Sequence, residues 1–463
     1  MSTNPAPGRE SAAVIRERRR VIGATVVGTT IEWYDFFIYA FAANLVFAQL
    51  FFEPAGSAMQ QILSLLSIGL SFLFRPLGAF LAGHFGDKIG RRPVLVITLL
   101  GMGGATTLIG ALPTFEAAGW SAPIILILLR IIQGICAGGE WGGAVLMSVE
   151  HAGDHQRGRF GMYPQLGVPG GMLLASLMLA LMSWIAPGEA FLVWGWRVPF
   201  LASLILIAVG WIVRMAVDES PIFNEIKEVQ AQESAPIGRL FAQHWQRVLL
   251  AALVFAGNGA VGYMVTGGFV QGLASRPPQD GGLGFDRTGV QIAVLGAAAI
   301  WLTSTFISGY LADMIGRKNT YLIGWVLQLA AVIPLFELVK TGVLGVFIGG
   351  GLLAIGLGFT YGPQAAWYAE IFPASVRFSG VSISYAIGAV AGGAFAPTIA
   401  QALLQSYGTT WAIIPYLAGM TIIGAIATIL LRERKGIPLD GAFEKSGQWE
   451  SWKPGDQVVV AKG

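Results

Sequence analysis

Long apolar stretches, separated by short polar segments, run through almost the whole of this 463-residue chain. A helix needs about 20 apolar residues to cross the hydrocarbon core of a bilayer. We expect twelve such helices, at residues 21–50, 59–83, 93–113, 121–150, 157–186, 194–217, 248–275, 288–311, 319–340, 343–369, 377–406 and 410–431. The separators carry Pro, Gly and charge, which favours turns. The pattern predicts an all-α integral membrane protein.

The basic residues predict how the chain lies in the membrane. If both termini are cytoplasmic, the inner side carries 23 of the 29 Lys and Arg residues, and Arg75 and Arg130 lie within spans. The positive-inside rule produces this imbalance, and an odd number of spans would scramble it. The polar, basic first twenty residues lack the apolar core of a cleaved signal. We therefore expect a multi-pass protein of the plasma (inner) membrane with an uncleaved first span.

A polar segment divides the spans into two sets of six. We expect a cytoplasmic basic tail, an N-terminal six-helix bundle, a cytoplasmic linker, a C-terminal six-helix bundle and a cytoplasmic C-terminal tail, at 1–20, 21–217, 218–247, 248–432 and 433–463. The last of these is polar and rich in glycine, so we expect it to be largely unstructured.

Composition argues against a soluble enzyme. Charged residues make up 12% of the chain, against about 25% in soluble domains. The single cysteine, Cys136, excludes an intrachain disulfide and a cysteine metal cluster. His151 and His155 have zinc-ligand spacing, but Gly153 between them weakens a helix there. We therefore expect no enzyme activity, cofactor, metal or nucleic-acid partner.

One charged loop occurs twice, 226 positions apart. Gly83–Arg92 and Gly309–Lys318 both read Gly, three residues, Asp, two residues, Gly and two bases. A repeat at about half the chain length predicts two structural repeats, which in membrane proteins are typical of alternating-access carriers rather than passive channels.

The acids and bases of the repeats predict a gate on the inner side. Salt bridges across the bundles would close it, and breaking them would let the bundles rock apart. Exposed pairs are individually weak, which suits a gate. The alternative is that the loops are only basic anchors of the inner face. The expected gate residues are Asp87, Arg91, Arg92, Glu150, Arg157, Asp313, Arg317, Glu370 and Arg377.

Five charged residues fall inside the predicted spans: Glu32, Asp35, Arg75, Arg130 and Glu140. A charge at the bilayer centre costs about 2.5–3.5 kcal/mol on insertion scales, so each should face a cavity or a partner. Glu32 and Asp35 share a helix face, and two close carboxylates resist ionising together. We expect the three acids and Arg130 to couple transport to protons. The alternative is a fixed ion pair of the acids with Arg75 or Arg130.

Substrate contacts are expected where polar and aromatic groups recur at helical spacing. Arg130 and Gln133 lie on one stripe of the fourth span, and a guanidinium can hold a carboxylate with two hydrogen bonds. Arg75 could bind substrate or pair with Asp35. Such groups also join helices without touching substrate. The other candidates are Tyr34, Tyr163, Gln165, Asn258, Tyr263, Tyr361, Gln364, Trp367 and Tyr368.

Several phrases together resemble a known family. The duplicated loop resembles the signature of the major facilitator superfamily, and Arg130-Ile131-Ile132-Gln133-Gly134 resembles the Arg-x-x-Gln-Gly motif of its fourth span. The second half has no counterpart of that motif. Residues 28–37, 74–78, 138–143, 194–200 and 219–221 resemble the metabolite:proton symporters within the superfamily. The resemblance, over residues 20–435, implies two pseudo-symmetric six-helix bundles. It also implies transport of citrate, 2-oxoglutarate, shikimate, aromatic acids, or proline and betaine, usually with protons.

These observations together predict a secondary active transporter. We expect a monomer in the lipid bilayer that takes up a small organic acid by proton symport, through alternating access. The intramembrane arginines favour an anion over a cationic drug. Proton-coupled uptake of proline or betaine, and a gradient-independent facilitator, remain alternatives.

Overall fold

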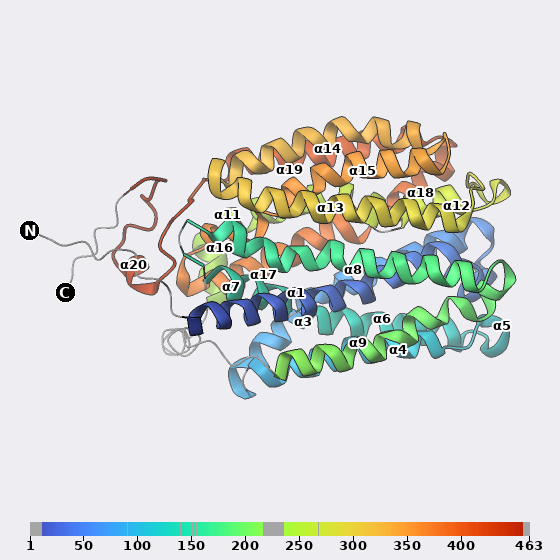
Figure 1. Ribbon diagram of the computed structural model, residues 1–463, viewed down its shortest axis with the longest axis horizontal. Coiled ribbons are helices and arrows are strands. Elements are labelled where there is room, and N and C mark those ends of the chain that lie inside the picture. Colours follow the sequence, from blue (N-terminus) through green and yellow to red (C-terminus); the bar gives the residue numbers. More distant parts are fainter. Residues whose placement is uncertain are drawn as a thin grey trace, which may run out of the picture.

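The computed structural model describes residues 12–89, 91–138, 140–150, 152–153, 155–215, 236–266 and 268–456. Every regular element among these residues is a helix. Figure 1 shows the helices packed side by side along one long axis, with the start of α1 (Ala12–Ala42) and the short α20 (Gly441–Lys445) near the same end. We call that end the basic end, because α16 (Gln364–Ile371) lies there and its Glu370 joins a charged network with Arg317, Arg157 and Asp313.

The first half of the chain forms six spans. Their helices are α1 (Ala12–Ala42) with η1 (Ala43–Phe47) and α2 (Ala48–Phe51), α3 (Ser57–Ile89), α4 (Arg91–Ala111), α6 (Ser121–Ala137) with α7 (Glu140–Glu150), α8 (Arg157–Ile185), and η3 (Phe191–Gly195) with α9 (Arg197–Met215). The short α5 (Phe115–Ala118) lies between α4 and α6.

The second half forms the other six. Its helices are α11 (Pro236–Thr266) with α12 (Phe269–Ser275), α13 (Arg287–Ile315), α14 (Arg317–Val339), α15 (Val343–Tyr361) with α16 (Gln364–Ile371), α17 (Arg377–Gly388) with η6 (Ala389–Ala394) and α18 (Ala396–Tyr407), and α19 (Ile413–Leu430). The all-α, twelve-helix prediction is confirmed, and ten segments of the described residues are long and apolar enough to cross a membrane by themselves.

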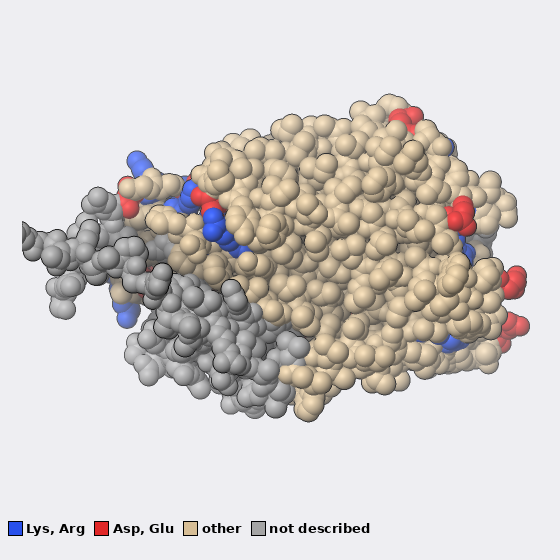
Figure 2. Space-filling view, viewed as in Figure 1, with Lys and Arg blue, Asp and Glu red and all other residues tan. Residues whose placement is uncertain are grey.

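The surface between the two ends is apolar. Figure 2 shows Lys, Arg, Asp and Glu gathered at the two ends of the molecule, with a broad uncharged middle. Large side chains such as Leu204, Ile205 and Val326 are more than 60% exposed there. This arrangement suits a surface that faces lipid, because lipid tails solvate apolar side chains without cost.

Glycines let the helices of the first bundle approach closely. A Cβ on Gly134 of α6 would lie 2.4 Å from the carbonyl oxygen of Ser71, and one on Gly138 would lie 2.0 Å from that of Arg75, both on α3. Small residues at helix contacts are the usual way to bring backbones together in membranes. This contact fixes α3 against α6, and with it the depth of Arg75 and Arg130.

The two halves meet mainly where α8 runs alongside α13 (Figure 1). Met162 of α8 packs so closely on Gly309 of α13 that a Cβ at position 309 would lie 2.4 Å from the methionine sulfur. A second contact joins α3 to η6, where a Cβ on Gly69 would lie 2.4 Å from the carbonyl oxygen of Ala394. The two bundles therefore touch directly at these two helix contacts.

The expectation of an unstructured tail is wrong for residues 432–456, which we call the C-terminal segment. Ile437, Phe443, Trp449 and Trp452 form a small hydrophobic core of their own, and α20 (Gly441–Lys445) lies within it. The segment is held to the bundle by hydrogen bonds, including one from the backbone N–H of Lys318 to Glu433 at 2.7 Å. The four large apolar residues have no helical or strand periodicity, so the sequence pattern gave no sign of this core.

Candidate functional site

The two acids of α1 are held by different partners. The Glu32 carboxylate lies 3.9 Å from Nη2 of Arg75 on α3, and both side chains are 4% exposed or less. The Asp35 carboxylate accepts a 2.7 Å hydrogen bond from the hydroxyl of Ser203 on α9. The expected pair of Arg75 with Asp35 is therefore replaced by one with Glu32, one turn away on α1, because Asp35 faces Ser203 of α9.

Arg75 is a buried cation with hydrogen-bonding capacity left over. Its guanidinium carbon lies 4.6 Å from the ring centre of Phe72 and 5.4 Å from that of Trp33. No hydrogen-bond acceptor among the described residues reaches its buried Nε. A buried donor without an acceptor is costly, so the site favours an incoming anion.

Arg130 is engaged within its own bundle. It donates to Gln133 Oε1 at 2.8 Å, to Ser71 Oγ at 2.9 Å and to the Ile68 carbonyl at 3.1 Å. Its guanidinium carbon also lies 3.8 Å from the ring centre of Tyr39. These contacts join α6 to α3 and α1. A substrate carboxylate could bind Arg130 only by displacing some of them.

Three predicted contact residues meet between the bundles. The Gln165 side chain on α8 donates to the carbonyl of Tyr361 at 3.2 Å and to Gln364 Oε1 at 3.3 Å. The indole N–H of Trp141 on α7 donates to Gln165 Oε1 at 3.1 Å. One amide therefore links the two halves of the protein.

Other predicted contacts lie inside one half. The Asn258 side chain accepts hydrogen bonds from Gln328 at 3.2 Å and from Thr360 at 2.6 Å within the second bundle. The Tyr34 hydroxyl donates to the Pro199 carbonyl at 2.8 Å within the first.

The remaining candidates have equally local surroundings. The Tyr368 hydroxyl donates to the Ala251 carbonyl, the Trp367 and Tyr321 rings lie 4.9 Å apart, and the Tyr163 ring packs on Phe160. Glu140 is buried as the first residue of α7. The side chain of Tyr263 lies outside the described part of the chain.

Sequence reasoning missed two buried aromatic residues at the contact between the bundles. Trp141 of α7 and Tyr385 of α17 stack across the bundles with ring centres 3.8 Å apart and planes 16° apart. Tyr385 also interacts electrostatically with Arg75 and Glu32. The available signal was weak: Trp141 follows Glu140 in a glycine-rich phrase, and Tyr385 interrupts a run of small residues.

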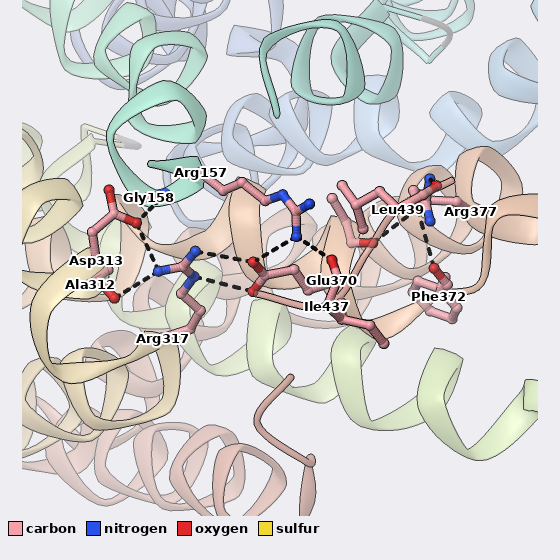
Figure 3. Close-up of polar contacts among 11 residues, drawn as sticks. Arg157, Gly158, Ala312, Asp313, Arg317, Glu370, Phe372, Arg377, Ile437 and Leu439 are labelled. Carbon is pink, nitrogen blue, oxygen red and sulfur yellow. Dashed lines mark hydrogen bonds and ion pairs between the residues drawn. The ribbon is translucent and has the colours of Figure 1, made fainter. Parts of the chain in front are cut away.

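At the basic end, Asp313 binds the start of a helix in the other half. Figure 3 shows its carboxylate at the end of α13, against the first turn of α8. The carboxylate accepts hydrogen bonds from the backbone N–H groups of Gly158 at 2.8 Å and Arg159 at 2.9 Å. It also pairs with Arg317 at 2.9 Å. A negative charge at a helix N-terminus is stabilised by the free N–H groups and the helix dipole.

Glu370 joins the next part of the gate (Figure 3). Its carboxylate lies 3.0 Å from Nη2 of Arg317 in its own half and 3.6 Å from Nη1 of Arg157 in the other half. A second cross-bundle pair, Arg377 with Glu150, is 3.8 Å apart. The structure brings these residues together in the described part of the chain, and the side chains of Asp87, Arg91 and Arg92 lie outside it.

The gate differs from expectation in its burial. The side chains of Arg317 and Glu370 are fully buried, and Arg157 is 3% exposed. The expectation of exposed, individually weak pairs is therefore wrong here, because α8, α13 and the C-terminal segment cover them. The Arg157 guanidinium donates to the carbonyl of Ile437, and Arg377 donates to that of Leu439 at 2.8 Å.

Comparisons with known proteins agree with this architecture. Residues 21–239 match the family model for sugar (and other) transporters, and residues 277–461 match that of the major facilitator superfamily. The proton:xylose symporter XylE has the same fold, with a TM-score of 0.73 at 16% identity over 94% of this chain and 99% of that one.

Relatives with higher identity extend over nearly the full length. The inner membrane metabolite transport protein YhjE of Escherichia coli is 36% identical, covering 91% of this chain and 96% of the relative. The shikimate transporter of Escherichia coli is 34% identical, covering 94% and 98%. The chain therefore belongs to the major facilitator superfamily, as a multi-pass membrane transporter related to metabolite transport proteins, and is not an enzyme.

Proposed function

We propose that this protein takes up a small organic acid together with a proton. Arg75 carries the proposal: a cation 3% exposed, with an N–H that has no acceptor among the described residues, is prepared to receive a carboxylate. It lies beside Glu32 and close to the contact between the two bundles. That is where carriers of this architecture hold their cargo.

The Glu32–Arg75 pair also supplies a route to proton coupling. When a substrate carboxylate binds Arg75, it competes with Glu32 for the same cation. A carboxylate that is buried and loses its counter-charge favours the protonated form. Binding of the anion therefore favours protonation of Glu32, and protonation favours binding. The negative charge of the substrate then crosses the membrane together with the positive charge of the proton. In this mechanism Asp35, hydrogen-bonded to Ser203, and Arg130, bonded to Gln133, shape the surroundings of the pair.

Alternating access follows from the gate at the basic end. By the positive-inside rule, that end and both termini lie on the cytoplasmic side of a bacterial-type inner membrane. With Asp313 on the first turn of α8 and Glu370 on Arg157, the inner side is closed. Release of these contacts lets the two bundles rock apart and discharge substrate inward. One chain holds both bundles, so a monomer suffices.

A zwitterion is the second candidate, favoured by the same pair. Glu32 and Arg75 offer one negative and one positive charge 3.9 Å apart. Proline or betaine could put its cationic group on Glu32 and its carboxylate on Arg75.

Uptake into proteoliposomes of the purified protein tests the proposal. Benzoate, shikimate, 2-oxoglutarate, citrate and proline are offered with and without an inward proton gradient. We expect gradient-driven uptake of an acid, collapsed by a protonophore, lost in Arg75→Gln and insensitive to the gradient in Glu32→Gln. Glu337→Gln, an exposed acid paired with Lys340, is the matched control. Equilibration at the same rate without a gradient would make the protein a facilitator, and uptake of proline alone would favour the zwitterion.

A further inference from the structure

Three aromatic rings from both bundles form a continuous stack next to Arg75. Tyr385 of α17 lies between Trp141 of α7 and Phe255 of α11, with ring centres 3.8 Å and 4.2 Å away. The planes of Tyr385 and Trp141 are 16° apart, close to parallel. All three side chains are 4% exposed or less.

The stack is oriented by its surroundings. The Trp141 indole N–H is fixed on Gln165, whose amide also reaches the carbonyl of Tyr361 in the other half. Tyr385 lies one turn before η6, a π-helical stretch of α17, and such stretches are frequent at functional sites.

The polar tip of Tyr385 faces the charged pair. Its hydroxyl lies within the electrostatic reach of Arg75 and Glu32. The side chain is thus a flat ring with an oxygen directed towards a buried cation. A ring-bearing carboxylate has the same layout, with a stronger acceptor at the tip, because an ionised oxygen forms a stronger hydrogen bond to a guanidinium than a phenol does.

From this geometry we infer that the substrate is a cyclic or aromatic monocarboxylate whose ring stacks on Trp141 in place of Tyr385, with its carboxylate on Arg75. The inference rests on the proposed transport of an organic acid and adds the class of acid. In the closed structure, Tyr385 occupies the ring position itself. Open-chain acids such as citrate can bind Arg75, but they have no ring that could stack on the aromatic face.

Binding of benzoate and of citrate to the purified protein, by titration calorimetry, tests the ring position. We expect benzoate to bind more tightly than citrate. Trp141→Leu should weaken benzoate binding about tenfold, while Trp141→Phe, which keeps a stacking face, should retain most of it. Trp184→Leu is the matched control, because that tryptophan is 74% exposed on the lipid-facing surface.

The Tyr385→Leu variant distinguishes replacement of the Tyr385 ring by the substrate ring from a purely structural role of that ring. If the Tyr385 ring competes with the substrate ring, its removal should tighten benzoate binding several-fold, because no ring has to leave first. Weaker benzoate binding in Tyr385→Leu, or Trp141→Leu affecting benzoate and citrate equally, would overturn the inference. Tight, gradient-driven transport of citrate alone would also overturn it and leave the proposed function intact. If no organic acid is transported, both the proposed function and this inference are wrong.

Discussion

Replacing Asp313 by alanine should open the inner side of the transporter. The carboxylate caps two backbone N–H groups of α8, at 2.8 and 2.9 Å, from across the bundle interface. Loss of such a cap costs about 0.5–2 kcal/mol, and loss of the charge at the helix end costs about 0.3–1 kcal/mol more. The pair with Arg317 lies within one half and survives opening, so it does not enter this difference. The closed state should lose about 1–3 kcal/mol, a shift of about 5–150-fold towards the inward-open state.

Cysteine modification measures that shift. Met162 is fully buried between α8 and α13, so Met162→Cys in a Cys136→Ser background reports opening of the inner side. We expect Asp313→Ala to raise the rate of labelling by a membrane-impermeant maleimide in inside-out vesicles. The labelling rate of Asp313→Asn should lie between those of the unchanged protein and Asp313→Ala. Its amide oxygen can still accept a hydrogen bond from one backbone N–H, but it carries no charge.

A matched cap provides the control. Asp286 accepts a 2.6 Å hydrogen bond from the backbone N–H of Gly289 at the start of α13, so this cap lies within one half. Asp286→Ala should leave Met162→Cys labelling unchanged. If Asp313→Ala labels no faster than Asp286→Ala, the cap does not distinguish the closed from the open state, and the reasoning fails.

Three further changes test the gate and the packing. Glu370→Gln leaves two buried arginines without their shared carboxylate and should lower the free energy of unfolding by about 3–5 kcal/mol, seen as a lower Tm in detergent. Gly138→Ala should abolish the monodisperse peak in size-exclusion chromatography, because its Cβ would lie 2.0 Å from a backbone oxygen, whereas Gly143→Ala meets nothing within 4 Å and should not. Burial and the nearby Arg247 lower the pKa of His244, which charges as the pH falls. The stability that this neutral histidine contributes is present above about pH 6.5 and lost at lower pH. Because Arg247 beside it pairs with Glu450 of the C-terminal segment, proteolysis of residues 432–456 should speed up between pH 7 and 5.

The sequence predicted the helices and the repeat because both depend on patterns along the chain. Span length and the duplicated loop need no knowledge of neighbours, and they gave the twelve helices and the residues that meet at the basic end. The role of Asp313 was less accessible. Its position in the loop suggested an ion pair, but its cross-bundle partners are backbone N–H groups, which every residue carries and no pattern marks.

The centre of the protein was harder to predict, because partners there depend on how helices face one another. Glu32 and Asp35 share a face of α1, yet the first pairs with α3 and the second with α9. Trp141 and Tyr385 are single aromatic residues among small ones, and they matter only because α7 and α17 approach each other. Such contacts appear only when register and crossing angle are fixed in space.

The C-terminal segment shows which contacts must break when the inner side opens. Its hydrogen bonds through Glu433 to Lys318 and through Glu444 to Ser375 attach it to the second half, so it should move with that half. The carbonyl of Ile437, however, accepts from Arg157 in the first half. In the proposed cycle, opening would break this bond together with those of Asp313 and Glu370, while the small core of Trp449 and Trp452 would stay intact. The segment would thus add contacts that keep the inner side closed. These contacts could break and re-form in every transport cycle without the segment unfolding.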